Sequence, residues 1–470
     1  MKTLLSVYGI NAFAFLSNLA AVFVFLALAG PQGYGTYGIY IVFLAIYYLW
    51  EVSLIKTALF MRSQGREPPP GYSDATADTR PVAFIHGSLI PFGLGSAFLI
   101  AMGNLLYPVD PATGIGGQLV LVIVALEHLL SYPANRLIYH LTVEKEFRTV
   151  YAFRLAATLL RHLFAWGVLF LTGSVFWAIA AILAKGLIVG AVSFWWISGR
   201  FRMPARMPMR IGLPDLGMVA SFFAAAAIVV VMQELPSLHI DRTYGREALG
   251  HYRLLYDVIA VVWFLATVYP TILFSYLLAG RESGRTPDSS SHLIFFADRL
   301  SLFHLVYFFG VCALITYERL FLWGYFAEVP YAIGVAAGVA MLGYSRFLIE
   351  AAQAYGAGRR VLVATCVTVA CVGLVLAFLP TEAGLAEIGW AWLFGQLLFF
   401  TLLKINLVGV IPGHTGHFRD TAILIPATLL TVAAHHLLPD VAFLGLCLAG
   451  ATVSLAALAG LLRGGMTPGT

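Results

Sequence analysis

Long apolar runs dominate this chain and restrict it to one kind of fold. Runs long enough to cross about 30 Å of hydrocarbon, at about 1.5 Å of rise per helical residue, recur along its whole length. Only 11% of the 470 residues are charged, which is too few to cover the surface of a soluble protein of this size. The sequence therefore predicts an all-α polytopic membrane protein.

Fourteen transmembrane helices are predicted from these runs. The first run is too long for the apolar segment of a signal peptide, so we interpret it as a retained helix. The predicted spans are 4–28, 37–62, 82–107, 117–139, 148–171, 175–198, 214–235, 250–278, 300–317, 329–354, 360–380, 385–407, 420–438 and 440–463.

The distribution of basic residues orients the predicted helices. With a cytoplasmic N-terminus, most of the 28 lysines and arginines lie on cytoplasmic loops or helix ends, and few, such as Arg242 and Arg246, lie outside. Both termini are therefore expected in the cytoplasm. The formal charge of +5 is too small to suggest a nucleic-acid partner.

One short phrase occurs twice along the chain. Gly35 and Tyr37 lie 215 positions before Gly250 and Tyr252, and the phrase begins the second and the eighth predicted helices. An offset of six helices preserves orientation, so the pattern predicts a parallel, pseudo-twofold duplication. The predicted parts are an N-terminal lobe at 1–212, a C-terminal lobe at 213–410 and two additional helices at 411–470.

The segments "LALAGPQGYGTYGIYIVF" and "LGHYRLLYDVIAVVWFLATVYP" resemble the helix 2 and helix 8 signatures of Wzx-type polysaccharide flippases. That family belongs to a superfamily that also holds the lipid II flippase and the multidrug and toxin extrusion antiporters. The chain departs from the family at Arg253, Leu254 and Leu255, where small residues are usual.

The resemblance implies two six-helix lobes around a central polar cavity, with the last two helices forming a groove for a lipid tail. It implies transport of an undecaprenyl-diphosphate-linked oligosaccharide from the cytoplasmic to the periplasmic leaflet of the bacterial inner membrane. The product would serve capsule, exopolysaccharide or O-antigen synthesis. A polymerase and glycosyltransferases of the same pathway are the implied partners.

Charged residues inside the spans are the candidate functional residues. Each costs about 2.5–3.5 kcal/mol at the centre of a membrane helix, so each is expected to face a cavity or a partner. The basic candidates for contact with a diphosphate are Arg161, Lys185, Lys56, Arg154, Arg253 and Arg346. The carboxylates that can couple transport to an ion are Glu127, Glu51, Asp257 and Glu350.

Spacing separates these candidates. Arg154 and Arg161 are seven residues apart, so they project from one face of a helix, and guanidinium groups match phosphate oxygens in bidentate geometry. Arg154 also fits a residue whose head group reaches the cytoplasmic interface. Glu127 has no charged residue within a helical turn, which suits either a titrating coupling site or a carboxyl held neutral by hydrogen bonds.

The remaining candidates differ in whether a neighbour can neutralise them. Glu51 and Lys56 are five apart and lie on different faces, so each needs another partner. The i,i+4 pairs can instead neutralise each other. These pairs are Arg253 with Asp257 and Arg346 with Glu350.

Two other functions compete with the flippase. A drug or organic-cation antiporter of the same superfamily would need an acidic, aromatic cavity, whereas basic candidates outnumber acidic ones here. A membrane-embedded glycan polymerase or ligase would use substantial outer loops, and those predicted here are short. We therefore expect a transporter that is not an enzyme.

Cysteine and glycine patterns complete the expectations. The four cysteines lie in apolar runs without CxxC spacing, so no disulfide framework, metal site or cofactor is predicted. "GLIVG" at 186–190 and "GVAAG" at 334–338 have GxxxG spacing, which is typical of close helix packing.

Overall fold

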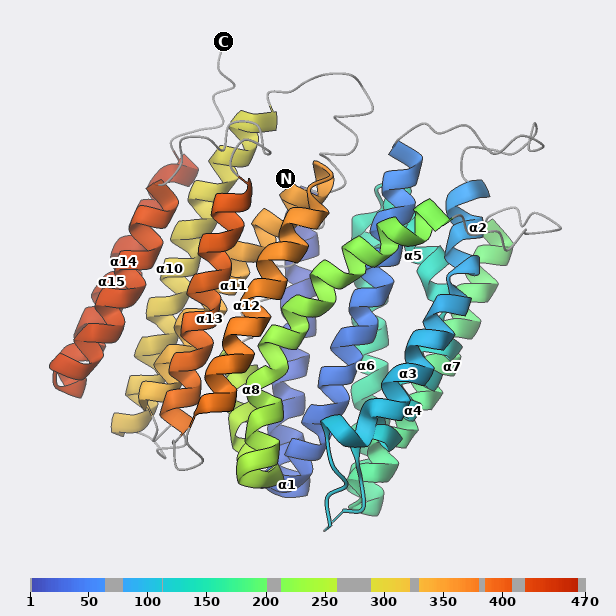
Figure 1. Ribbon diagram of the computed structural model, residues 1–470, viewed down its shortest axis with the longest axis horizontal. Coiled ribbons are helices and arrows are strands. Elements are labelled where there is room, and N and C mark those ends of the chain that lie inside the picture. The colour runs from blue at the N-terminus through green and yellow to red at the C-terminus, as the bar shows by residue number, and fades with distance from the viewer. Residues whose placement is uncertain are drawn as a thin grey trace. The chain divides into compact units, whose positions relative to one another are not determined.

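The structure is a computed structural model that describes residues 2–63, 79–111, 113–200, 213–259, 289–321, 329–379, 385–407 and 419–463. All regular elements in these ranges are helices (Figure 1). Nine of the described helices are long and apolar enough to cross a membrane, or ten if a bent pair counts as one span. The prediction of an all-α polytopic membrane fold is confirmed.

The chain divides into two compact units at the bond between Asp257 and Val258. This division rests on contacts within each unit. The sequence repeat instead predicted lobes at 1–212 and 213–410, with two added helices at 411–470. Those lobes remain a prediction. Helices of the first unit are α1 (Lys2–Ser63), α2 (Thr79–Gly87), α3 (Leu89–Leu106), α4 (Gly117–Ser131), α5 (Pro133–Val143), α6 (Phe147–Thr172), α7 (Val175–Arg200) and α8 (Leu213–Ile259) through Asp257.

The second unit holds the remaining described helices. They are α10 (Ser289–Phe321), α11 (Val329–Ala354), α12 (Gly358–Phe378), α13 (Leu385–Leu407), α14 (Arg419–Leu437) and α15 (Asp440–Arg463). Of the predicted eighth span at 250–278, the part beyond Ile259 lies outside the described residues.

Two of the helices change direction at a single glycine. In α1, Gly30 has φ 68° and ψ 178°, and in α8, Gly245 has φ 85° and ψ 179°, whereas the flanking residues are helical. A positive φ with extended ψ is available to glycine at little steric cost. Pro31 then begins the second half of α1, where a missing N–H costs nothing.

The kink in α1 replaces a predicted connection. The sequence predicted a non-helical segment at 29–36, but the structure has one non-helical residue between the two halves. The apolar stretch Gly9–Met61 is 53 residues long. At about 1.5 Å per residue this length is sufficient to cross a membrane twice. The two predicted helices are therefore present, joined without a loop.

A second break divides the predicted span at 117–139. The axes of α4 and α5 meet at 53°, with Tyr132 between them and Pro133 as the first residue of α5. Proline removes one hydrogen bond from the continuing ladder, which explains the position of the bend.

Glycine spacing fixes the closest helix contacts in each unit. A Cβ on Gly190 of α7 would lie 2.0 Å from the carbonyl oxygen of Leu130 in α4. In the second unit, a Cβ on Gly338 of α11 would lie 2.0 Å from the ring of Trp392 in α13. Both predicted GxxxG segments are thus confirmed as close packing surfaces.

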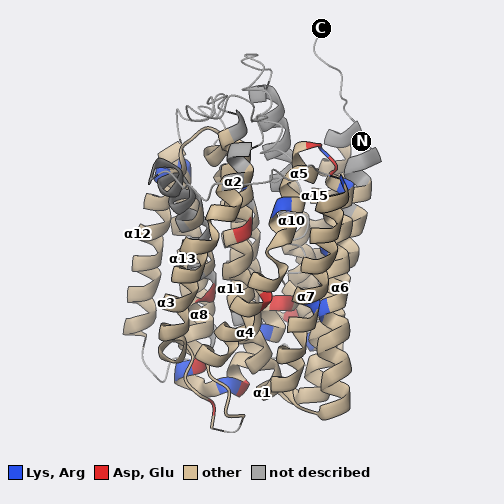
Figure 2. Cartoon of the chain, turned by 90° about the vertical axis from the view of Figure 1, so that its right-hand side faces the viewer, with Lys and Arg blue, Asp and Glu red and all other residues tan. Residues whose placement is uncertain are grey.

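The outward surfaces of the helices are apolar. Phe170 on α6 and Trp195 on α7 are each 77% exposed, as expected of side chains that face lipid. Figure 2 shows that charged residues occupy few positions along the described helices. Those few positions define the candidate site.

Candidate functional site

The two halves of the repeated phrase cross each other within the first unit. A Cβ on Gly35 would lie 2.3 Å from the carbonyl oxygen of Arg246, and one on Gly250 would lie 1.9 Å from that of Pro31. Pro31 and Arg246 each follow a kink, and they are also 215 positions apart. The contacts are therefore reciprocal, as a pseudo-twofold axis through the crossing requires.

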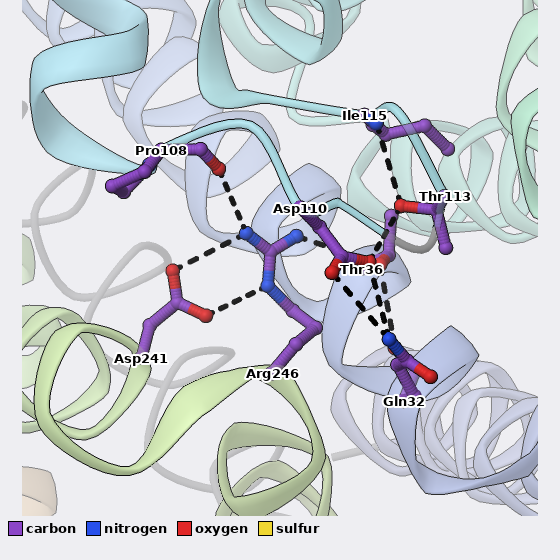
Figure 3. Close-up of polar contacts among 8 residues, drawn as sticks. All are labelled: Gln32, Thr36, Pro108, Asp110, Thr113, Ile115, Asp241 and Arg246. Atoms are coloured by element: carbon purple, nitrogen blue, oxygen red, sulfur yellow. Dashed lines mark hydrogen bonds and ion pairs between the residues drawn. The ribbon is translucent and has the colours of Figure 1, made fainter.

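Arg246 fastens this crossing through several hydrogen bonds (Figure 3). Its Nε donates to Asp241 Oδ1 at 2.7 Å and its Nη2 donates to Oδ2 at 3.3 Å, which is a bidentate ion pair. Nη2 also donates to the carbonyl of Pro108 at 3.2 Å, and Nη1 lies 3.5 Å from Thr36 Oγ1. One guanidinium thus connects α8, α1 and the segment between α3 and α4.

Asp110 holds that α3–α4 segment against α1. Its carboxylate accepts a hydrogen bond from Thr113 Oγ1 at 2.7 Å and from Gln32 Nε2 at 3.3 Å, as Figure 3 shows. The backbone of Asp110 donates to Ile115 at 3.1 Å and accepts from Gly114 at 2.8 Å. This short connection is therefore a compact turn rather than a loose loop.

A second buried charge cluster surrounds Arg253 in α8. Arg253 is 2% exposed, and its Nη1 donates to both oxygens of Glu234, at 3.0 and 2.8 Å. Its Nη2 reaches Asp257 Oδ1 at 3.4 Å, and Tyr34 donates to the other oxygen of Asp257 at 2.5 Å. Two carboxylates thus share one guanidinium.

The side chain of Arg253 fits because a glycine lies opposite. A Cβ on Gly38 would lie 2.9 Å from Arg253 Cγ, and Gly38 is the position 215 residues before Arg253. This explains how the chain accommodates an arginine where the resembling family has small residues. With both carboxylates around it, Arg253 is neutralised inside the protein, and a contact with substrate remains a prediction.

Glu127 and Lys185 form an ion pair between α4 and α7. Glu127 is fully buried, and its Oε1 accepts a hydrogen bond from Lys185 Nζ. His128 Nδ1 lies 3.5 Å from the other carboxylate oxygen. The sequence has no charged residue within a helical turn of Glu127, but the fold brings Lys185 of another helix against it.

Arg161 in α6 has a neutral partner. Its Nη2 donates to Asn18 Oδ1 at 2.7 Å, and the same oxygen lies 2.9 Å from Nε2 of the adjacent His162. The His162 ring stacks on Trp166 at 5.1 Å. No carboxylate in the described ranges pairs with Arg161, and its buried Nε has no hydrogen-bond partner there.

Arg154 lies two turns away on the same helix in a different environment. One of its nitrogens is 4.0 Å from Glu51 of α1, and both side chains are partly exposed. Its guanidinium lies over the Tyr48 ring at 5.4 Å and the Tyr151 ring at 5.9 Å. Arg154 is thus the partner that Glu51 was expected to need.

Three predicted residues remain. Lys56 is buried on α1, and Arg346 and Glu350 are partly buried on α11 of the second unit. Each of the three has an interaction within the protein. Their roles as cavity cations and coupling carboxylate remain predictions.

Sequence reasoning missed several residues of these clusters. Asn18 and His162 are neutral and gave no signal in a search for charges inside spans. Arg246 was expected on the outer side, because the helix that continues to Gly245 was predicted to end at residue 235, and Glu234 and Asp241 were not among the candidates.

One ion-pair group lies outside the membrane-spanning segments. Arg200 donates to Glu144 at 2.8 Å and to Glu146 at 2.6 Å, in the short connection between α5 and α6. The hydrogen bond from Arg200 holds the pKa of Glu146 below its ordinary value. All three side chains are exposed, so we assign this group to surface structure.

In the described ranges, no group of three or more histidine, cysteine, aspartate or glutamate side chains is arranged to hold a metal ion. Some of the described ion pairs join different helices, among them Glu127 with Lys185 and Glu51 with Arg154.

Comparisons with known proteins identify the fold. No family model and no curated protein sequence matches the chain. A Vibrio cholerae MATE transporter has a TM-score of 0.60 at 15% identity, covering 90% of this chain and 98% of its own. The lipid II flippase MurJ, in an inward closed conformation, has a TM-score of 0.60 at 11% identity, covering 97% and 98%.

A third solved structure is an outward-facing multidrug resistance MATE family transporter of the MOP superfamily. It has a TM-score of 0.57 at 12% identity and covers 90% of this chain and 96% of its own. At these identities the likeness concerns the fold, and it extends over nearly the whole chain. The chain therefore has the fold that MATE transporters share with the lipid II flippase MurJ.

Proposed function

We propose that this chain is a flippase for an undecaprenyl-diphosphate-linked oligosaccharide. It would move the lipid-linked glycan from the cytoplasmic to the periplasmic leaflet of a bacterial inner membrane by alternating access, with both termini in the cytoplasm. The glycan would serve capsule, exopolysaccharide or O-antigen synthesis, beside the glycosyltransferases and polymerase of that pathway. The fold shared with a lipid II flippase supports transport of a lipid-linked sugar.

The observation that carries this proposal is the environment of Arg161. A cation inside a membrane-spanning helix is stable where water, a carboxylate or an anionic ligand meets it. Lys185 and Arg154 have carboxylates at Glu127 and Glu51, but Arg161 donates to the neutral amide of Asn18. Its positive charge is thus available to the diphosphate of a substrate, whose oxygens match the planar guanidinium.

Flipping in cells tests the proposal directly. In a bacterium that depends on this chain for glycan export, Arg161→Ala should abolish export while the protein still accumulates in the membrane. Arg161→Lys should restore export in part, because an ammonium keeps the charge but loses the bidentate fork. Arg200→Ala, which removes an exposed arginine, is the matched control and should export normally. Normal export by Arg161→Ala would contradict the proposal.

A drug or organic-cation antiporter is the second candidate, and the cluster around Arg253 favours it. There two carboxylates surround one guanidinium, beside Tyr34 and Tyr256, which is an acidic and aromatic environment. Two of the solved structures described above are MATE transporters, one of them a multidrug resistance protein. If the chain is an antiporter, its expression should confer resistance to ethidium in a sensitive strain. Deletion of its gene should then leave glycan export unchanged.

The enzyme alternative has less support. The solved structures described above are transporters and a flippase, which is consistent with a protein that moves its substrate without chemical change.

A further inference from the structure

The bend between α4 and α5 places three nitrogen-bearing side chains near one another. Tyr132, at the bend, donates to the carbonyl of Ile85 at 2.6 Å and contacts Ser88, which fixes α5 against α2. His86 lies in the same turn of α2, and Arg136 lies in the first turn of α5 and His140 in its last turn. Discontinuous helices of this kind form ligand sites in membrane transporters.

Arg136 is buried and has no counter-ion among the described residues. It is 3% exposed, and its Nε donates to His140 Nε2 at 3.5 Å, which is the outer limit of a hydrogen bond. No carboxylate in the described ranges pairs with it, whereas the buried Arg246 and Arg253 both have one. A buried guanidinium loses its hydration, so a favourable anion is the expected compensation.

The two histidines differ in what they contribute beside Arg136. His86 Nε2 is buried and has no hydrogen-bond partner in the described part of the chain. His86 directly follows Ile85, whose carbonyl accepts the hydrogen bond from Tyr132, and Arg136 lies one turn after Tyr132, so both side chains lie beside the contact between α2 and α5. His140 accepts from Arg136 through Nε2 and so helps to orient the guanidinium. With these donors and no described carboxylate, the cluster is suited to an anion rather than a cation.

We propose that Arg136 and His86, supported by His140, bind a phosphate group at the α4–α5 bend. The planar guanidinium donates hydrogen bonds to two phosphate oxygens, and the His86 ring nitrogen donates one to a third. This site is distinct from Arg161, which lies on α6, and it does not depend on the proposed flippase activity. The phosphate comes either from a free anion or from the head group of a lipid, and both present the same oxygens.

Thermal unfolding of the purified full chain in detergent tests the free anion. Inorganic diphosphate should raise the Tm of the wild type by mass action, measured against sodium chloride of equal ionic strength. Arg136→Gln should weaken apparent binding on the order of tenfold or more, Arg136→Lys less, and His86→Gln less than Arg136→Gln. Arg200→Gln, which alters an exposed arginine, should retain the full shift.

Native mass spectrometry tests the lipid source with a matched pair of ligands, undecaprenyl phosphate and undecaprenol. Retention of the phosphate lipid, but not the alcohol, by the wild type and its loss in Arg136→Gln assigns the site to a head group. A Tm shift with diphosphate and no preference between the lipids assigns it to a free anion. If Arg136→Gln does not fold, His86→Gln provides the comparison. The proposal is overturned if neither ligand binds, or if the variants bind both as the wild type does.

Discussion

Gly35 and Gly250 are equivalent residues in two copies of one motif, and each packs against the residue that follows the other's kink. The repeated phrase is explained by this geometry, because any larger side chain at either position would meet a backbone carbonyl. Two helices related by a pseudo-twofold axis need a small residue at the same place in both copies. The crossing therefore explains why both copies of the phrase carry a glycine at this position.

We expect Gly250→Ala to destabilise the protein. The added Cβ would lie 1.9 Å from the Pro31 oxygen, so the two backbones must separate. Overpacking of this kind typically costs about 1–3 kcal/mol. Gly167→Ala, at an exposed position of α6, is the control. Its added Cβ would meet no neighbouring atom of the described residues within 4 Å, so the change should be neutral or should stabilise the protein by up to about 1 kcal/mol. Thermal unfolding in detergent compares them, and equal Tm values would refute the close crossing.

Glu127 and Lys185 should behave as one unit in a double-mutant cycle. Glu127→Gln leaves Lys185 without its carboxylate, and breaking a buried ion pair typically costs about 3–5 kcal/mol. The double variant with Lys185→Met removes the stranded charge and should recover much of this loss. Chemical unfolding of the four proteins measures the coupling energy. Additive effects would show that the two side chains do not interact.

Arg253 and Arg154 should differ strongly in their importance for folding. Arg253→Gln leaves Glu234 and Asp257 facing each other in a buried site, so we expect low accumulation of folded protein in the membrane. Arg154→Gln removes one partner of a partly exposed contact at 4.0 Å and should cost less than about 1 kcal/mol. Detergent-resistant folded protein, measured by size-exclusion fluorescence, distinguishes the two. A larger effect at Arg154 would contradict the assigned environments.

The predicted orientation has a simple test in labelling with a membrane-impermeant maleimide. Pro111 lies in the α3–α4 turn and Lys145 in the α5–α6 connection, and both are exposed. Each substitution is made in a variant of the chain that lacks its native cysteines. Pro111→Cys should react with the reagent in intact cells, whereas Lys145→Cys should react only after lysis. A reporter that is active only in the periplasm should be silent when fused after Arg463. Labelling of Lys145→Cys in intact cells would show that the orientation is the reverse of the predicted one.

The fold was predictable because its signals are local and strong. The length of the apolar runs predicted the helices, and GxxxG spacing predicted the close packing of α7 and α11. The repeated phrase marked the two helices that cross. Partners distant in sequence were not predictable. Glu127 and Lys185 are 58 residues apart, and nothing along the chain indicates that α4 and α7 bring them together.

The environment of Arg161 was partly predictable. Its depth in a span indicated that it needs a partner, but the partner is a neutral side chain 143 residues away on α1. The same limit applies to Arg136, which lies near the end of the predicted span at 117–139, where hydropathy does not indicate how deeply a side chain is buried. Side-chain environment depends on helix rotation, and rotation is set by packing partners that a single sequence does not reveal.

The direct joining of helix halves at Gly30 and Gly245 constrains how this chain can vary in evolution. Both kinks stand five residues before the crossing glycine, so the two spacers have equal length. Inserting one residue into either spacer would rotate the following helix by about 100° and turn its glycine away from the opposite carbonyl. Homologous chains should therefore seldom carry an insertion between either kink and its crossing glycine.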